Sequence, residues 1–144
     1  MTEIAFHFNA PAKLGYACRL VRKATGTGAK VVVTGEREQL KRLDVELWTF
    51  SPLEFIAHCN AVDAAQGVVA ASPVVLADST QASPHHEVLV NLGASVPQGF
   101  ERFERLIEVV TQDEDDRQQA RQRWKHYADR GYQIKRFDLA GREA

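Results

Sequence analysis

The segment from residue 117 to residue 136 holds the side chains whose types and spacing are best suited to chemistry. It contains seven basic residues and one acidic residue. If it begins as a helix, which turns about 100° per residue, Arg117, Arg121 and Lys125 follow one another along one face. Trp124 stands seven residues after Arg117 and falls on the same face. Cations beside an indole suit an acidic peptide or a terminal carboxylate, with the ring taking up an apolar side chain.

Two other interpretations of this basic stripe stay open. A charged helix face is commonly just solvated, with Trp124 turned into the core. Basic grooves with aromatic side chains also stack the bases of single-stranded nucleic acid. One tryptophan in a chain of net charge −1 makes a poor base-stacking platform. An acidic protein tail therefore fits the sequence better than a nucleic acid.

A second candidate surface is a cluster of large apolar residues in the middle of the chain. Three aromatic and two aliphatic side chains crowd into positions 48–56: Trp48, Phe50, Leu53, Phe55 and Ile56. Tryptophan and phenylalanine are typical of the buried centre of a protein–protein contact. A core beneath a loop explains the cluster equally well.

Other motifs in the chain are better explained by structure than by catalysis or ligand binding. Gly26-Thr27-Gly28 is similar to part of a phosphate loop, but a predicted helix ends there and a strand begins, which reverses the order that phosphate binding needs. The adjacent His85 and His86 would point to opposite faces of a strand and could not easily share one metal ion. The four acidic residues 113–116 suit the positive end of a helix. We therefore predict no catalytic residue, no metal site and no cofactor.

The composition is that of one globular domain without an unusual charge. A chain of 144 residues, 44% hydrophobic and 26% charged, can bury a core without disulfide or metal staples. A net charge of −1 argues against a dedicated duplex-DNA binder. No apolar run is long enough to span a membrane, and the first residues lack the features of a secretion signal. Because Cys18 and Cys59 are far apart and outside any CxxC motif, we expect reduced thiols in a cytoplasmic protein.

Strand and helix patterns alternate along the chain and must position these side chains. Residues 4–8 alternate like a strand, residues 13–24 carry an apolar helix face, and residues 30–33 form a β-branched run. Later elements are predicted as helices at 36–47 and 113–129 and as strands at 74–77, 88–92, 106–110 and 132–137. This order predicts an α/β three-layer sandwich with a mostly parallel, Rossmann-like sheet flanked by helices. We expect residues 1–144 to form a single domain, with residues 139–144 as a frayed tail.

Four segments, in their order and spacing, resemble the chi subunit of bacterial DNA polymerase III holoenzyme. They are residues 42–48, 55–58, 87–92 and 120–127. The resemblance covers nearly the whole chain. It implies a nucleotide-binding-like α/β fold that binds no nucleotide, in a non-catalytic accessory protein of the clamp-loader complex.

The resemblance also implies partners. Chi-like proteins pair with the small psi subunit, which tethers them to the clamp loader. They also hold the acidic C-terminal tail of single-stranded DNA-binding protein, and so reach DNA only indirectly. On this basis Arg121 and Lys125 match the basic positions that receive the tail, with Trp124 as the aromatic position between them. Arg117 matches a further basic position, and Val110 lines the apolar part of the pocket.

The second surface also has a counterpart in the resemblance. Trp48 and Phe55 match the aromatic positions on the face used for psi, which in some relatives also serves a repair helicase. Residues 113–116 depart from the family pattern, and we expect their charge to weaken binding of an acidic tail at that edge. The alternative to a binding subunit is a small α/β nucleotide-binding protein or enzyme of unknown substrate. It would hold its ligand at the carboxyl ends of the parallel strands.

Overall fold

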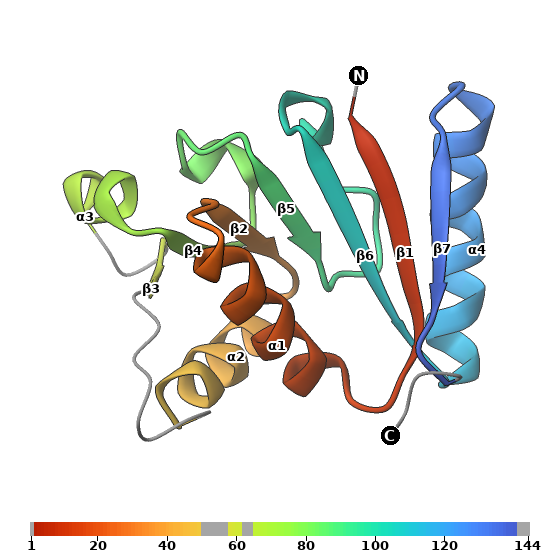
Figure 1. The fold of residues 1–144 in the computed structure, drawn as a ribbon, viewed down its shortest axis with the longest axis horizontal. Coiled ribbons are helices and arrows are strands. Elements are labelled where there is room, and N and C mark those ends of the chain that lie inside the picture. The colour runs from red at the N-terminus through yellow and green to blue at the C-terminus, as the bar shows by residue number, and fades with distance from the viewer. Residues whose placement is uncertain (1, 50–57, 62–64, 141–144) are drawn as a thin grey trace.

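A parallel sheet runs through the centre of the molecule (Figure 1). The computed structural model describes residues 2–49, 58–61 and 65–140. Within these residues, seven strands stand in the order β3-β4-β2-β5-β6-β1-β7, and every pair of neighbours is parallel. Their bounds are β1 Glu3–Ala10, β2 Val31–Thr34, β3 His58–Asn60, β4 Val74–Ala77, β5 Val88–Asn91, β6 Arg105–Thr111 and β7 Ile134–Asp138.

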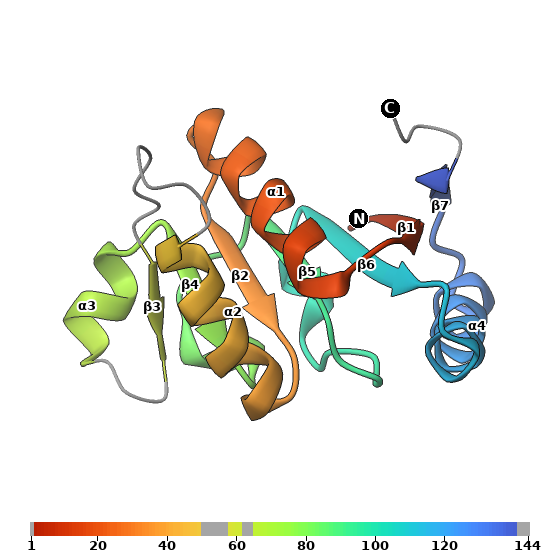
Figure 2. The ribbon, with the colours of Figure 1, turned by 90° about the horizontal axis from the view of Figure 1, so that it is seen from below.

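Helices cover both faces of the sheet. In the described part of the chain they are α1 Lys13–Gly26, α2 Arg37–Thr49, α3 Gln66–Ala71 and α4 Glu114–Asp129, with 3₁₀ turns at Thr80–Ala82 and Phe100–Arg102. Buried side chains of α1 and α2 pack on one face, and those of α3 and α4 pack on the other. Figure 2 shows the strands spread from β3, beside α3, to β7, beside α4. The predicted three-layer α/β fold is confirmed.

The central strands are apolar because they are covered on both sides. The strands β2, β4 and β5 read Val-Val-Val-Thr, Val-Val-Leu-Ala and Val-Leu-Val-Asn, and all of their residues are buried. A parallel sheet between two helical layers needs apolar side chains on both faces of each strand. The β-branched run at residues 30–33 therefore predicted a buried strand correctly.

Two short elements, β3 and α3, were not predicted from the sequence. The strand β3 has three residues, His-Cys-Asn, and α3 has six, so neither is long enough for its period to show. The last strand begins at Ile134, two residues later than predicted. The reason is that Tyr132 donates its backbone N–H to the carbonyl of Tyr127 at 3.1 Å and still belongs to the end of α4.

The remaining sequence expectations concern thiols, tail and membrane. Cys18 is buried and Cys59 half-buried, and both are free thiols. Leu139 donates its N–H to the carbonyl of Phe8 at 3.0 Å and packs on the core. Residues 141–144 lie outside the described residues, so the fraying of the tail stays a prediction. Among the described helices, none is long and apolar enough to cross a membrane.

Candidate functional site

A pocket of about 180 Å³ lies between helix α4 and strands β1, β6 and β7, and we refer to it as the α4 pocket. Its apolar lining is Phe6, Phe8, Val110, Ala120 and Trp124, and its polar lining is Asn9, Thr111, Arg117, Arg121 and Arg136. Of the five residues that the resemblance assigned to an acidic tail, the structure gathers four around this one cavity: Val110, Arg117, Arg121 and Trp124.

Local sequence explains how α4 presents its side chains to the pocket. Asp113 caps the helix by accepting a hydrogen bond from a backbone N–H of the first turn at 3.1 Å. Arg117, Ala120, Arg121 and Trp124 then follow at positions i, i+3, i+4 and i+7, which lie on one face of a helix. The small buried Ala120 keeps the helix close to the sheet, while its long neighbours frame the opening.

Trp124 combines the two roles that its sequence context left open. The side chain is half-buried, and its ring centroid lies 5.0 Å from that of Phe6 on β1. It packs against the core on the α4 side of the sheet and also lines the α4 pocket. The indole is therefore both part of the core and part of the wall of the cavity.

Lys125 is not among the residues that line the α4 pocket. It is exposed on α4. At about 100° per residue, Lys125 stands about 80° around the helix from Arg117. Trp124 stands only about 20° from Arg117, on the other side. The stripe of cations recognised in the sequence therefore turns away from the cavity at its last member.

Arg136 on β7 is a pocket residue that the sequence did not single out. The strand β7 pairs in parallel with β1, with Arg136 opposite Phe6. The guanidinium carbon of Arg136 lies 5.0 Å from the ring centroid of Phe8 and 6.0 Å from that of Trp124. The only signal in the sequence was the basic pair 135–136 in a predicted strand, because strand pairing is not written in the local pattern.

Asn9 ends the regular part of β1 beside the pocket. Its φ of 63° lies in the left-handed region, which asparagine tolerates better than most residues. The register between β1 and β6 shifts between His7 and Ala10, which marks a bulge. The side-chain Nδ2 of Asn9 donates to Asp138 Oδ1 on β7 at 2.8 Å. This bond joins the two strands at the mouth of the α4 pocket.

Three of the four acidic residues at the start of α4 form internal contacts: Asp113, Glu114 and Asp116. Asp116 accepts hydrogen bonds from Lys13 Nζ at 2.8 Å and from the backbone and hydroxyl of Thr111 at 2.8 and 2.9 Å. Burial alone would raise the pKa of the Asp116 carboxyl, but these hydrogen bonds and the charge of Lys13 lower it. Glu114 differs from Asp116 because it contacts a pocket residue: its Oε1 lies 3.7 Å from Arg121 Nη1. Repulsion of an acidic ligand at this edge stays a prediction, and Glu114 is its clearest source.

A buried polar network seats α4 on the sheet. Glu108 on β6 is fully buried and accepts hydrogen bonds from Arg123 Nε at 3.0 Å, from Asn91 Nδ2 at 3.0 Å and from the hydroxyl of Tyr127. Arg123 also donates from Nη1 to the carbonyl of Ala94 at 3.0 Å. The buried Glu108–Arg123 pair is tolerated because further hydrogen bonds satisfy most of its polar atoms. Within the described part of the chain, Arg123 Nη2 is buried and has no hydrogen-bond partner. Arg123, one of the seven basic residues of segment 117–136, is thus a core residue.

Burial governs the ionisation of this network. Complete burial raises the pKa of the Glu108 carboxyl, against the lowering effect of Arg123 and of the hydrogen bonds from Tyr127 and Asn91. Burial and the neighbouring Glu108 also raise the pKa of the Tyr127 hydroxyl far above its ordinary value, so Tyr127 stays a donor. The network fixes the rotation of α4, and with it the direction in which Arg121 and Trp124 point.

Trp48, the one member of the second predicted surface among the described residues, lies at the other end of the sheet. Trp48 in the last turn of α2 is 56% exposed and Val45, one turn earlier, is 61% exposed; we refer to these two as the α2 patch. The ring of Trp48 lies 4.9 Å from that of His58 on β3, whose Nε2 is 2.9 Å from Asp44 Oδ1. Phe55 lies outside the described residues. In Figure 1, α4 stands at one end of the molecule, and α2 lies in the other half, towards β3.

A comparison with known protein families identifies the family of this chain. The family model described as "DNA polymerase III chi subunit, HolC" matches residues 1–135. The chain belongs to the chi subunit family. The resemblance read from residues 42–48 and 120–127 is confirmed at the level of the family.

Three relatives of this chi-family chain are named DNA polymerase III subunit chi. The protein from Pseudomonas aeruginosa is 31% identical over 139 residues, covering 93% of this chain and 94% of its own. The protein from Haemophilus influenzae is 28% identical over 120 residues, covering 82% and 81%. The protein from Escherichia coli is 26% identical over 119 residues, covering 81% and 79%.

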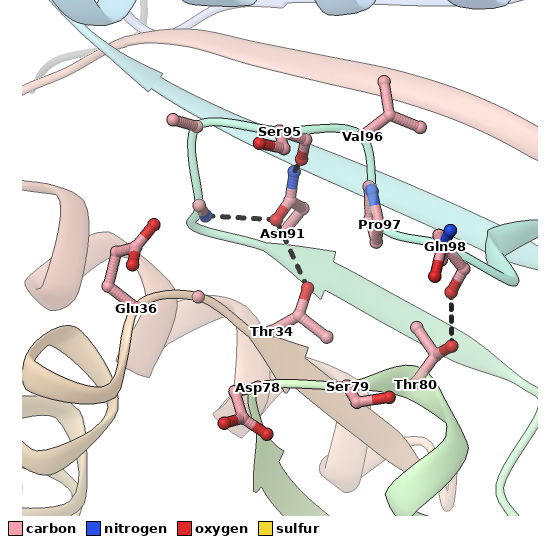
Figure 3. A pocket seen from close by; sticks show the side chains of 13 residues that line it. Thr34, Glu36, Asp78, Ser79, Thr80, Asn91, Ser95, Val96, Pro97 and Gln98 are labelled. Atoms are coloured by element: carbon pink, nitrogen blue, oxygen red, sulfur yellow. Dashed lines mark hydrogen bonds between the residues drawn. The ribbon is translucent and has the colours of Figure 1, made fainter.

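This chi-family chain also has a cavity where a doubly wound α/β protein would bind a ligand. It measures about 300 Å³ and lies beyond the carboxyl ends of β2, β4 and β5 (Figure 3). Its polar groups are engaged with one another: Thr34 donates to Asn91, Asn91 donates to the carbonyl of Ser95, and Thr80 donates to that of Gln98. The carboxylate of Glu36 in its lining would repel a phosphate, whereas that of Asp78 is paired with Arg37 Nε at 2.9 Å. These contacts do not favour the nucleotide-binding alternative.

Proposed function

We propose that this chi-family chain is a non-catalytic accessory subunit of the replicative DNA polymerase III holoenzyme, acting in the cytoplasm at replication forks. It bridges the clamp loader, through psi, to single-stranded DNA-binding protein. Membership of a family named for a subunit of DNA polymerase III supports a role within that complex. The two candidate surfaces support a bridging role, since they lie at opposite ends of the sheet.

The α4 pocket carries the proposal for the tail of single-stranded DNA-binding protein. The decisive observation is that Arg117 and Arg121 frame an apolar cavity that contains Trp124 and Val110. Guanidinium groups bind carboxylates through paired, charge-assisted hydrogen bonds. A cavity of about 150 Å³ holds a benzene ring, so the 180 Å³ here has room for one large apolar side chain of the tail. An acidic tail with an apolar residue matches both features.

The α2 patch supports the proposal for psi. Trp48 and Val45 present apolar surface on a helix at the β3 end of the sheet, where a partner would bury it. The proposal also assigns Phe55, which lies outside the described residues, to psi binding. A repair helicase that uses the same face would compete with psi for it.

Calorimetry with a synthetic peptide of the acidic tail tests the proposal. Arg117→Ala combined with Arg121→Ala should weaken binding at least about tenfold, because each charged hydrogen bond contributes roughly 1.5–3 kcal/mol. The matched control is Arg19→Ala with Lys23→Ala, which removes two exposed cations from α1. Unchanged binding in the pocket variant, or an equal loss in the control, would contradict the assignment.

A second arm of the same experiment separates protein tail from nucleic acid. A single-stranded oligonucleotide should not bind the isolated chain, nor should it compete with the peptide. Binding of the oligonucleotide that is lost in the Arg117→Ala, Arg121→Ala variant would favour the nucleic-acid alternative instead.

A further inference from the structure

We infer that Arg136 of β7, and not Lys125 of α4, supplies the third cation of the α4 pocket, so that an acidic peptide is held between a helix and an edge strand. The inference rests on the proposed function of the pocket as a peptide site. It assigns a specificity-determining role to a residue on β7, a strand that contributes none of the residues carried over from the family.

The strand pairing puts Arg136 on the face of the sheet that carries the pocket. In the parallel register Arg136 stands opposite Phe6 and Lys135 opposite Ala5. Successive residues of a strand point to opposite faces. Arg136 therefore shares a face with Phe6 and lines the pocket, whereas Lys135 points to the other side of the sheet. Two adjacent cations of one strand are thus separated by the whole thickness of the sheet.

The aromatic neighbours of Arg136 orient its guanidinium group. Its carbon Cζ lies 5.0 Å from the ring centroid of Phe8 and 6.0 Å from that of Trp124. Stacking engages the flat face of a guanidinium and leaves the N–H groups at its edge to donate in the plane. A side chain already held in this way loses little freedom when it binds a carboxylate. Lys125 is exposed and does not line the cavity, so its side chain would lose more freedom on binding a carboxylate.

The carboxylates already near the pocket leave Arg136 available for a ligand. On the helix side, Arg121 shares its charge with Glu114, 3.7 Å away. On the strand side, Asp138 Oδ1 accepts hydrogen bonds from Asn9 Nδ2 at 2.8 Å and from the backbone N–H of Ala140 at 3.0 Å. These bonds and, less strongly, the charge of Arg136 lower the pKa of the Asp138 carboxyl, so Arg136 interacts with Asp138 through its charge. An incoming carboxylate can therefore bind Arg136 without first displacing the bonds of Asp138.

The test compares single variants of the full chain in calorimetric titrations with an acidic peptide that ends in an apolar residue. Arg136→Ala should weaken binding about tenfold or more. Arg136→Lys should give an intermediate loss, since it keeps the charge but not the planar fork. Lys135→Ala, the matched control on the other face, and Lys125→Ala should each change affinity less than about threefold. Thermal unfolding of each variant checks that the fold is retained.

The outcomes distinguish a failure of this inference from a failure of the proposed function. If Arg136→Ala and Arg136→Lys bind like the parent while Arg121→Ala loses binding, the pocket takes the peptide without Arg136, and this inference fails alone. If Lys135→Ala loses as much as Arg136→Ala, only long-range attraction is at work, and the inference also fails. If the parent chain does not bind the peptide at all, the proposed function fails first.

Discussion

The two ends of the sheet offer different kinds of contact. At the β7 end, the α4 pocket sets guanidinium groups around an apolar floor, and a buried network holds its helix in place. At the β3 end, the α2 patch exposes Trp48 and Val45 on an open helix face. A charged pocket suits a short acidic peptide whose binding weakens with salt. An open apolar face suits a larger partner that buries it. The difference is consistent with the two unlike partners that we propose.

The largest effect is expected when the buried network that holds α4 on the sheet loses Arg123. Arg123→Ala leaves Glu108 buried without its counter-charge and should lower the free energy of unfolding by about 3–5 kcal/mol. Urea denaturation followed by circular dichroism measures it. The control Arg121→Ala removes an arginine that is 62% exposed and should cost less than about 0.5 kcal/mol. A loss below about 1 kcal/mol for Arg123→Ala would show that α4 does not depend on this network.

A crossed pair of variants tests whether the two ends act separately. Trp48→Ala should weaken binding of psi at least about tenfold, as expected for a central aromatic residue, and leave the acidic peptide unaffected. Arg121→Ala should do the reverse. Biosensor measurements with psi and with the peptide give both affinities. If either variant weakened both ligands to the same degree, the two surfaces would not be independent.

A smaller effect concerns Asp116, in the first turn of α4 beside the pocket. The pKa of the Asp116 carboxyl is lowered by its bonds to Lys13 and Thr111, in spite of burial. A lowered folded pKa stabilises the fold at neutral pH, and this contribution disappears as the pH falls through that pKa. Asp116→Asn should therefore cost about 1 kcal/mol at pH 7, with less difference from the parent below about pH 4.

Urea denaturation at pH 7 and pH 3 measures the effect of Asp116→Asn. Asp115→Asn is the control, because Asp115 lies in the same first turn of α4 and faces the same helix dipole but is exposed. A difference from the parent that grows on acidification would have the wrong sign for a lowered pKa.

The smallest effect sharpens the charge balance of the α4 pocket. Glu114→Gln frees Arg121 from an exposed partner and should raise the affinity for an acidic peptide about twofold, since such pairs contribute 0–1 kcal/mol. Calorimetry at low salt measures it, and the gain should vanish at high salt. Glu38→Gln, an exposed acid on α2, is the control. Weaker binding of the peptide by Glu114→Gln would mean that Glu114 helps the site.

Much of the fold and part of the site could be predicted because the signals were local. Asp113 caps α4, and the spacing of Arg117, Arg121 and Trp124 follows from the turn of a helix. The β-branched run at residues 30–33 predicted the buried strand β2. Short elements such as β3 were missed, because three residues show no period.

By itself, the sequence determined that Arg117, Arg121 and Trp124 share one face of α4 and which family the segments resemble. Only the tertiary structure decided that Arg136 enters the pocket and that Arg123 is buried against Glu108. The physical reason is that helix faces follow from spacing along the chain. The pairing of β7 with β1 and the rotation of α4, in contrast, are set by packing between residues far apart in the sequence.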